Sequence, residues 1–594
     1  MKYDFTSIPD RRGTGSTKWD EMRGASPDRV PLSVADMEFY TAPPIRKALA
    51  KLSEEMVLGY TKPNDAYFEA VKGWMKRRHN FDVKKEWIIQ TPGVIHALGL
   101  LIDAATKPED SVLVLSPVYY PFDNAIVAKG RKIVYSNLIN NDGRYEIDFA
   151  DLESKLKRKD VTAILFSSPH NPIGRVWETD ELLKAAQLCC DNDVFIISDE
   201  IHNDLIMPGF KHTVMATLSD EIRLNCAVCT APSKTFNLAG VQCSNIIIPN
   251  DEIRRRANNH AVLGMHSMLN IFTYTACIAA YNECEDWLEE LIDVIRQNAD
   301  TVEKYMAANF PQIKVSPLEG TYLQWLDLRG TGLNHVEQKL MFEDAGLWFD
   351  GGEMFGVTGR GFQRINLACC AETLEKSLER FGAALSAELE KRARDGSPVH
   401  ITVKEGDVLD GFVYNCAQGE VNLKDVLSKK TVIFFSRNLS CPLCRDDLDR
   451  LSVQYAEMQA NGYDLKVVVQ SSADDVAKEQ ANYPFELICD EDFTLYDRYN
   501  VFAADSTTRL VAGDAMFEKK YKASLARIMD SDELGRIFSY GVSEDYAERR
   551  RQLQLCATFV VDENAKVISA SYGKTIGERF CMAAGAADHT AQQL

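Results

Sequence analysis

The chain has 594 residues, with 67 basic and 87 acidic side chains and a formal net charge of −20. This charge disfavours binding to nucleic acid and to anionic membranes, and no apolar run approaches the roughly 20 residues that span a membrane. The first residues lack the apolar core of a secretory signal, and fifteen cysteines without such a signal favour reduced thiols over a disulfide framework. We therefore expect a cytoplasmic protein with more than one domain.

Short apolar runs alternate with longer amphipathic stretches through residues 1–390. The runs predict five buried strands, at residues 112–115, 163–166, 194–197, 226–229 and 245–248. The amphipathic stretches between them predict helices. This alternation predicts an α/β fold with a parallel sheet covered on both faces. In such sheets ligands bind at the carboxyl ends of the strands, so chemistry is expected in the loops that follow them.

A stretch rich in Glu, Lys and Arg separates this block from the rest of the chain. We place a linker at residues 391–399 and a second domain at residues 400–594. Within the second domain, the pattern predicts strands at residues 431–435, 465–469 and 558–561 and a helix at residues 441–459. The sequence thus predicts a second α/β domain after the first.

Polar residues follow three of the predicted strands in the first block. Asn171, Asp199 and Lys234 each come directly after a strand, 28 and 35 positions apart. Each interval fits one strand–helix–strand unit, so the three side chains can meet at one edge of the sheet. Ser233 precedes the lysine, and Arg364 lies further along the chain in the sequence GFQRIN.

These residue types meet the needs of pyridoxal chemistry. A lysine can hold the aldehyde as a Schiff base and later move protons, while a neighbouring serine such as Ser233 holds a phosphate. An aspartate such as Asp199 keeps the pyridine nitrogen protonated, so that the ring can accept electrons. The Asn171 amide can donate to the ring oxygen, and Arg364 can clamp a substrate carboxylate in a bidentate fork. We expect no metal ion at this site.

The order of these residues resembles that of the class I/II aminotransferase-like (fold type I) pyridoxal-phosphate enzymes, and within them the cystathionine β-lyase branch of carbon–sulfur lyases. The resembling stretches are residues 12–20, 34–39, 59–61, 91–97, 171–177, 198–205, 232–242 and 361–367. The resemblance implies the pyridoxal-phosphate-dependent transferase fold, with a large domain at about 45–285. A smaller domain would combine the N-terminal segment with residues 286–390.

The resemblance also implies further cofactor contacts. Backbone N–H groups at a helix start would hold the phosphate, and the residues concerned are Gly93, Val94 and Ile95. The Tyr119 ring would stack on the cofactor. His202 would lie beside it, either as a hydrogen-bonding or as a catalytic residue. Tyr60 would reach the cofactor of a neighbouring subunit, which implies a homodimer.

Gln242 separates two branches of this family. Aminotransferases of this fold usually carry an arginine eight residues after the lysine, whereas this chain has Gln242, as the lyases commonly do. The resemblance then implies elimination of a thiol from L-cystathionine or a related S-substituted cysteine, giving pyruvate and ammonia. An aminotransferase with the same cofactor, and a non-catalytic regulator of the same fold, are the alternatives.

Residues 400–594 resemble the thioredoxin-like fold, in its peroxiredoxin-like (AhpC/TSA-type) branch, over residues 434–448, 484–501 and 557–562. Cys441 begins the predicted helix, so the helix dipole and Arg445 are expected to lower its pKa. Cys444 could then close a disulfide, and Cys556 is expected to face Cys441. The pattern expected around a peroxidatic cysteine is incomplete. A redox pair that handles the released sulfur and a fold with inert buried cysteines both remain open.

Overall fold

The computed structural model describes residues 2–20, 22, 28–263, 269–395, 400–409, 411–503 and 553–573. The chain divides into two compact units, Met1–Asp395 and Gly396–Leu594. Helix α14 (Ala371–Asp395) continues into the segment assigned to the linker, and residues 396–399 lie outside the described residues. In the described ranges, no helix is both long and apolar enough to cross a membrane.

A seven-stranded sheet organises the N-terminal unit, in the order β2-β10-β9-β8-β7-β3-β4. Its strands are β2 (Ile88–Thr91), β3 (Ser111–Ser116), β4 (Lys132–Asn137), β7 (Val161–Ser167), β8 (Phe195–Asp199), β9 (Cys226–Thr230) and β10 (Ser244–Ile247). The predicted α/β class is confirmed. Strands β4, β3, β7, β8 and β9 are parallel to one another.

Strand β10 departs from the prediction of a wholly parallel sheet. It runs antiparallel to both of its neighbours, β9 and β2. The segment between β9 and β10 holds only a four-residue helix, α9 (Pro232–Thr235), and a short 3-10 turn, Ala239–Val241. A parallel connection needs a crossover that is usually a full helix, so this short segment returns the chain in the opposite direction.

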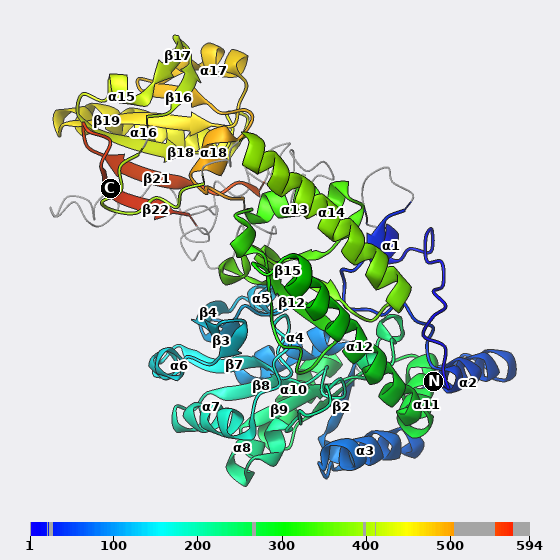
Figure 1. The fold of residues 1–594 in the computed structure, drawn as a ribbon. Helices are drawn as coiled ribbons and strands as arrows, with labels where there is room; N and C mark the ends of the chain where they lie inside the picture. Colours follow the sequence, from blue (N-terminus) through cyan, green and yellow to red (C-terminus); the bar gives the residue numbers. More distant parts are fainter. Residues whose placement is uncertain are drawn as a thin grey trace. The chain divides into compact units, whose positions relative to one another are not determined.

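Helices cover both faces of the sheet (Figure 1). The strands feed two separate cores, because alternate side chains of a strand point to opposite faces. In β7, Ala163 and Leu165 pack in one core and Ile164 and Phe166 in the other. The helices of this unit are α1 (Thr17–Asp20), α2 (Pro43–Glu55), α3 (Asp65–His79), α4 (Val94–Ala105), α5 (Pro121–Ala128), α6 (Phe149–Leu156), α7 (Thr179–Asp191), α8 (Asp220–Leu224), α9, α10 (Asp251–Leu263), α11 (Ile271–Glu283), α12 (Glu285–Asn309), α13 (His335–Asp344) and α14.

A second, four-stranded sheet in the same unit has the order β11-β12-β15-β14. Its strands are β11 (Lys314–Val315), β12 (Leu323–Asp327), β14 (Asp350–Gly351) and β15 (Phe362–Asn366), and helices α12 and α14 contact each other beside it. Two short pairs complete the unit: β1 (Val30–Pro31) with β13 (Leu347–Trp348), and β5 (Ile139–Asn141) with β6 (Arg144–Glu146). Strand β1 brings the N-terminal segment against this second part of the chain.

The C-terminal unit is a second α/β structure, built on a sheet in the order β17-β16-β20-β19-β18-β21-β22. The strands are β16 (Val413–Cys416), β17 (Gly419–Asn422), β18 (Lys430–Phe435), β19 (Tyr463–Val469), β20 (Glu486–Cys489), β21 (Ala557–Val561) and β22 (Val567–Tyr572). The helices are α15 (Leu423–Val426), α16 (Pro442–Ala460), α17 (Ala473–Glu479) and α18 (Thr494–Arg498). Parallel strands β18, β19 and β20 form its centre.

Candidate active site

The predicted site residues of the N-terminal unit lie at one edge of its seven-stranded sheet. Lys234 follows β9, Asp199 ends β8, Asn171 follows β7 and Tyr119 follows β3, and these four strands are parallel neighbours. Strand β2 runs the same way as β9, because each is antiparallel to β10. The loop after β2 at Gly93 therefore comes to the same edge. The topology brings together residues that are far apart in the sequence.

Lys234 is half-buried, and its amine lies in a polar environment. Its Nζ atom donates a hydrogen bond of 2.6 Å to the carbonyl oxygen of Ala35. Burial, together with the positive charge of Arg364, lowers the pKa of the Lys234 amine to about 8. A larger fraction of this lysine than of an exposed one is therefore neutral near pH 7, as a nucleophile or a general base requires.

Asp199 is a buried carboxylate that few protein groups stabilise. Its Oδ1 atom accepts a hydrogen bond of 3.1 Å from the backbone N–H of Ile201. Burial raises the pKa of Asp199 to about 7, although that hydrogen bond and the charge of Lys234 oppose the rise. A carboxylate in this position would be stabilised by a cationic N–H group placed against it, since an opposite charge favours the ionised form.

Arg364 reaches the same edge from the second sheet, where it lies on β15. Its Nη1 atom donates to Oδ1 of Asn171 at 2.8 Å, while Nε and Nη2 donate to Oδ2 of Asp350 at 3.1 and 2.5 Å. The guanidinium also lies over the Phe355 ring, 4.6 Å from its centroid. Asp350 is a partner that the sequence did not indicate. Arg364 is therefore held rigidly between the two sheets.

Helix α4 begins at the edge where a phosphate is expected. Gly93 is its N-cap residue, with φ of 135°, and Val94 is its first helical residue. Glycine suits this backbone conformation, which L residues rarely adopt. The first N–H groups of a helix point outward without helical partners and favour an anion. Ser233 precedes Lys234, Ile95 follows Val94, and both side chains are half-buried. Their contacts with a phosphate stay predictions.

Three further predicted residues have distinct environments. His202 is buried and its Nδ1 atom has no hydrogen-bond partner among the residues described. Burial, followed by the charges of Lys234 and Arg364, lowers the pKa of His202 well below its ordinary value, so the ring is neutral. Tyr60 is 99% exposed. Gln242 is exposed and ends the Ala239–Val241 turn with φ of 56°.

The arrangement fits pyridoxal phosphate. Asp199 is a buried carboxylate that a protonated ring nitrogen would stabilise, and the buried Lys234 amine can bond the aldehyde. Tyr119 follows β3 at the same edge, and the charges of Arg364 and Asp199 both act on its hydroxyl. Burial raises the pKa of that hydroxyl, so Tyr119 is neutral and able to stack on a ring.

The two predicted redox cysteines lie together in the C-terminal unit. Cys441 is the N-cap residue of α16 and Cys444 lies in its first turn, and both are buried free thiols. Nη2 of buried Arg437 lies 2.9 Å from Sγ of Cys441. Because Cys441 is a free thiol, no disulfide joins it to Cys556, which lies just before β21. A contact between Cys441 and Cys556 stays a prediction.

Within the thiol pair, the pKa of one cysteine is lowered and that of the other is raised. A hydrogen bond from Cys441, together with the charge of Arg437, lowers the pKa of Cys444 to about 5. The same hydrogen bond and burial raise the pKa of Cys441. From the sequence, the low pKa was expected at Cys441, caused by the helix dipole and Arg445. Arg445 instead bonds the Leu439 carbonyl oxygen and Glu479, and Arg437 supplies the positive charge beside the thiols.

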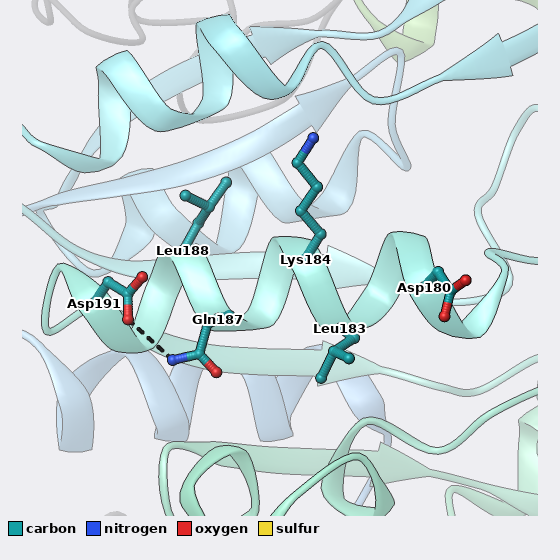
Figure 2. Close-up of a pocket in the computed structure, with 6 residues that line it drawn as sticks. All are labelled: Asp180, Leu183, Lys184, Gln187, Leu188 and Asp191. Atoms are coloured by element: carbon teal, nitrogen blue, oxygen red, sulfur yellow. Dashed lines mark hydrogen bonds between the residues drawn. The ribbon is translucent and has the colours of Figure 1, made fainter.

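One hollow on the described surface carries no comparable chemistry. A shallow hollow runs along α7 (Figure 2), and its lining residues are Asp180, Leu183, Lys184, Gln187, Leu188 and Asp191. All six belong to one helix, and none is among the predicted site residues. Within the described part of the chain, no group of three or more His, Cys, Asp and Glu side chains could hold a metal ion.

The fold and the site together define a pyridoxal-phosphate-dependent enzyme of the aminotransferase type, with an added thiol unit. The chain belongs to the aminotransferase class I and II family, whose model matches residues 27–381. The AhpC/TSA family model matches residues 406–570.

The similar proteins align with the N-terminal unit over their full length. Cystathionine β-lyase PatB of Bacillus subtilis is 41% identical over 389 residues, which are 64% of this chain and 100% of PatB. The crystal structure of cystalysin from Treponema denticola, which contains a pyridoxal 5′-phosphate cofactor, matches with 44% identity and a TM-score of 0.64. That match covers 65% of this chain and all of cystalysin. The pyridoxal-phosphate-bound C–S lyase from Staphylococcus hominis matches with 31% identity and a TM-score of 0.61, over 65% and 98% of the two chains.

The pKa of Lys234 predicts how the cofactor-free protein takes up pyridoxal phosphate. Because the neutral amine is the nucleophile, the association rate should rise with pH and level off above about 8, rather than near the ordinary value of 10.5. Stopped-flow absorbance of the cofactor across this pH range measures the rate. A half-rise near 10.5 would show that burial does not depress the pKa of this amine.

Proposed function

We propose that the N-terminal unit is a pyridoxal-phosphate-dependent carbon–sulfur β-lyase of the cystathionine β-lyase type. It removes the thiol from L-cystathionine or a related S-substituted cysteine and gives pyruvate and ammonia. The observation that carries the proposal is the half-buried Lys234, whose amine is hydrogen-bonded to Ala35 and influenced by the charges of Asp199 and Arg364. The names of cystathionine β-lyase PatB and of the Staphylococcus C–S lyase support the same reaction class, and cystalysin supports the cofactor.

Each of these residues has a defined role in this proposal. Bound pyridoxal phosphate supplies an electron sink for the bond cleavages at the substrate α- and β-carbons. Arg364 binds the substrate carboxylate in a bidentate fork, and Asp199 holds the proton on the ring nitrogen. The Nζ atom of Lys234 would hold the cofactor aldehyde between turnovers and, as the general base, would take the proton from the substrate α-carbon. Loss of the β-thiolate then completes the elimination.

Two observations favour elimination over transamination. Gln242 stands where aminotransferases of this fold usually carry a phosphate-binding arginine. The relatives described above include a cystathionine β-lyase and a C–S lyase. A purely regulatory role would not require Lys234, Asp199 and Arg364 in one buried cluster. Charged groups without a function at this edge would cost folding free energy, because their burial must be offset.

Replacement of Lys234 tests the lyase proposal. Purified wild-type protein with bound cofactor should release pyruvate from L-cystathionine, and Lys234→Ala should lower that rate by at least about 10³-fold, because both the covalent anchor and the general base are lost. Pyruvate is followed with a coupled dehydrogenase assay.

Lys211→Ala is the matched control, since Lys211 is exposed and outside the site, and it should keep wild-type turnover. Substantial pyruvate release by Lys234→Ala would contradict the assignment. Amino-group transfer to an added keto acid, without pyruvate release from cystathionine, would instead identify an aminotransferase.

The exposed segment that follows α2 supports a homodimer with shared active sites. Its apolar and aromatic residues are largely solvent-exposed in the single chain: Met56 55%, Val57 90%, Leu58 58% and Tyr60 99%. A run of exposed apolar side chains marks an interaction surface. We propose that a second copy of this chain covers the segment and that Tyr60 reaches the cofactor phosphate of the partner.

A charge in the exposed segment should separate the subunits. Leu58→Asp is expected to convert a dimer to a monomer and to weaken cofactor retention, because Tyr60 would no longer reach the neighbouring site. Light scattering gives the mass and dialysis the retained cofactor. Leu224→Asp is the control, since Leu224 is also 55% exposed but lies on α8. A wild-type monomer that retains its cofactor would contradict the proposal.

For the C-terminal unit we propose a redox-active dithiol that handles sulfur species released by the lyase. When the lyase substrate is a disulfide such as cystine, elimination releases a persulfide, R–S–SH. One thiolate of the Cys441–Cys444 pair attacks its sulfane sulfur and displaces the thiol RSH. The second thiol then closes the Cys441–Cys444 disulfide and hydrogen sulfide leaves. The dithiol supplies the two electrons. The free, mutually hydrogen-bonded thiols beside Arg437 support this role.

The thiolate of this pair should be visible by its ultraviolet absorbance. The difference between wild type and the double variant Cys441→Ser/Cys444→Ser should show one thiolate that ionises near pH 5. Arg437→Gln should move the ionisation upward by about one pH unit or more, because it removes the adjacent positive charge. A first ionisation at pH 9 in the wild type would indicate inert buried thiols.

A further inference from the structure

The acceptor of the Lys234 hydrogen bond belongs to an unusual turn in the N-terminal segment. Asp36 N–H donates to the Val34 carbonyl oxygen at 2.9 Å and closes a three-residue turn with Ala35 at its centre. Val34 has φ of 47°, which is a genuine outlier for a β-branched residue. Such strain persists only where surrounding contacts determine the backbone.

The Ala35 carbonyl serves two donors at once. It accepts from Lys234 Nζ at 2.6 Å and from the Tyr322 hydroxyl at 2.8 Å. The Nδ2 atom of Asn366 donates to the two flanking carbonyls, those of Val34 at 2.8 Å and of Asp36 at 2.7 Å. The turn therefore presents one carbonyl to the lysine amine, and its neighbours are tied to β15.

A cluster of four charged side chains holds the other side of the turn. Lys18 is 2% exposed, and its Nζ atom donates to the Asp36 carbonyl oxygen at 3.0 Å and pairs with Glu38 at 2.8 Å. Arg11 pairs with both oxygens of the Asp36 carboxylate, at 2.6 and 3.1 Å. A lysine this deeply buried is rare unless it is paired. The cluster lies outside the proposed catalytic roles of Lys234, Asp199 and Arg364.

We propose that Lys18 is a positioning residue for Lys234. By holding the backbone at Asp36, it keeps the Ala35 carbonyl where the amine of Lys234 docks whenever that amine is not bonded to the cofactor. The docked amine would stay at the sheet edge to which Asp199 and Asn171 also belong. The proposal rests on the role of Lys234 as the cofactor-bearing lysine.

Lys18 also influences Lys234 through its charge, which acts on the pKa of the Lys234 amine. The groups whose charges act on the Lys234 amine are Arg364 on β15, Asp199 at the end of β8, and Asp36 and Lys18 in the N-terminal segment, while His202 is neutral. The positive charge of Lys18 lowers the pKa of Lys234, and the negative charge of Asp36 raises it. Removal of one or the other should therefore shift the amine in opposite directions.

The test uses cofactor association by the full-length, cofactor-free protein, which does not depend on which reaction the enzyme catalyses. Lys18→Met should move the half-rise of the rate with pH upward and slow association at pH 7.5 by about threefold to tenfold, as one pKa unit is a factor of ten. Lys18→Arg should restore most of the rate. Asp36→Asn should move the half-rise downward.

Three outcomes would overturn the proposal. The first is an unchanged pH profile in a Lys18→Met protein with wild-type circular dichroism. The second is a shift in the same direction for Lys18→Met and Asp36→Asn, which would mean general loosening of the fold. The third is an equal effect of Lys159→Met, a change of an exposed lysine on the surface. If Lys18→Met fails to fold, Asp36→Asn and Lys18→Arg still decide the question. A lyase failure with a normal association profile would count against the proposed reaction and leave this inference standing.

Discussion

The hydrogen bond from the Lys234 amine to the Ala35 carbonyl is the contact at which the parts of the N-terminal unit meet. Lys234 comes from the end of β9 and Ala35 from the N-terminal segment, and Asn366 of β15 ties that segment to the second sheet. A buried amine must be hydrogen-bonded, because an unsatisfied one would cost several kcal/mol. The need for this hydrogen bond therefore fixes the relative positions of the end of β9, the turn at Ala35 and strand β15 of the second sheet.

Burial acts with opposite results in the two units, depending on the nearest charge. At the lysine site, burial lowers the pKa of Lys234 to about 8 and raises that of Asp199 to about 7. The neutral form of each group is therefore more populated near neutral pH than it would be in water. Buried thiols without a cation, such as Cys229, have a raised pKa. At the Cys441–Cys444 pair, an internal hydrogen bond and Arg437 reverse the sign for one thiol. Burial disfavours the charged form of each group, and a neighbouring charge or hydrogen bond can reverse the resulting pKa shift.

The sequence could predict much of the fold and the residues of the site, and physical reasons limit the rest. Buried parallel strands have a distinct apolar pattern, so the strand ends that carry Asn171, Asp199 and Lys234 were predictable. Strand direction has no such signature, which is why the reversal of β10 was missed. Ala35 contributes only a backbone carbonyl, and residue type does not reveal it. Arg437 and Arg445 are each four residues from Cys441, and only the folded loop distinguishes them.

Arg364 stands on β15, whereas the residues proposed to hold the cofactor stand on the loops of the seven-stranded sheet. In the proposed function, the binding of the amino acid and the binding of the cofactor are thus encoded in separate stretches of the chain. Mutations around β14 and β15 that keep the hydrogen bond from Arg364 to Asn171 are expected to reshape the recognition of the substrate without loosening the cofactor. A scaffold divided in this way is well suited to diversify during evolution, because new substrate preferences can arise while the shared chemistry is retained.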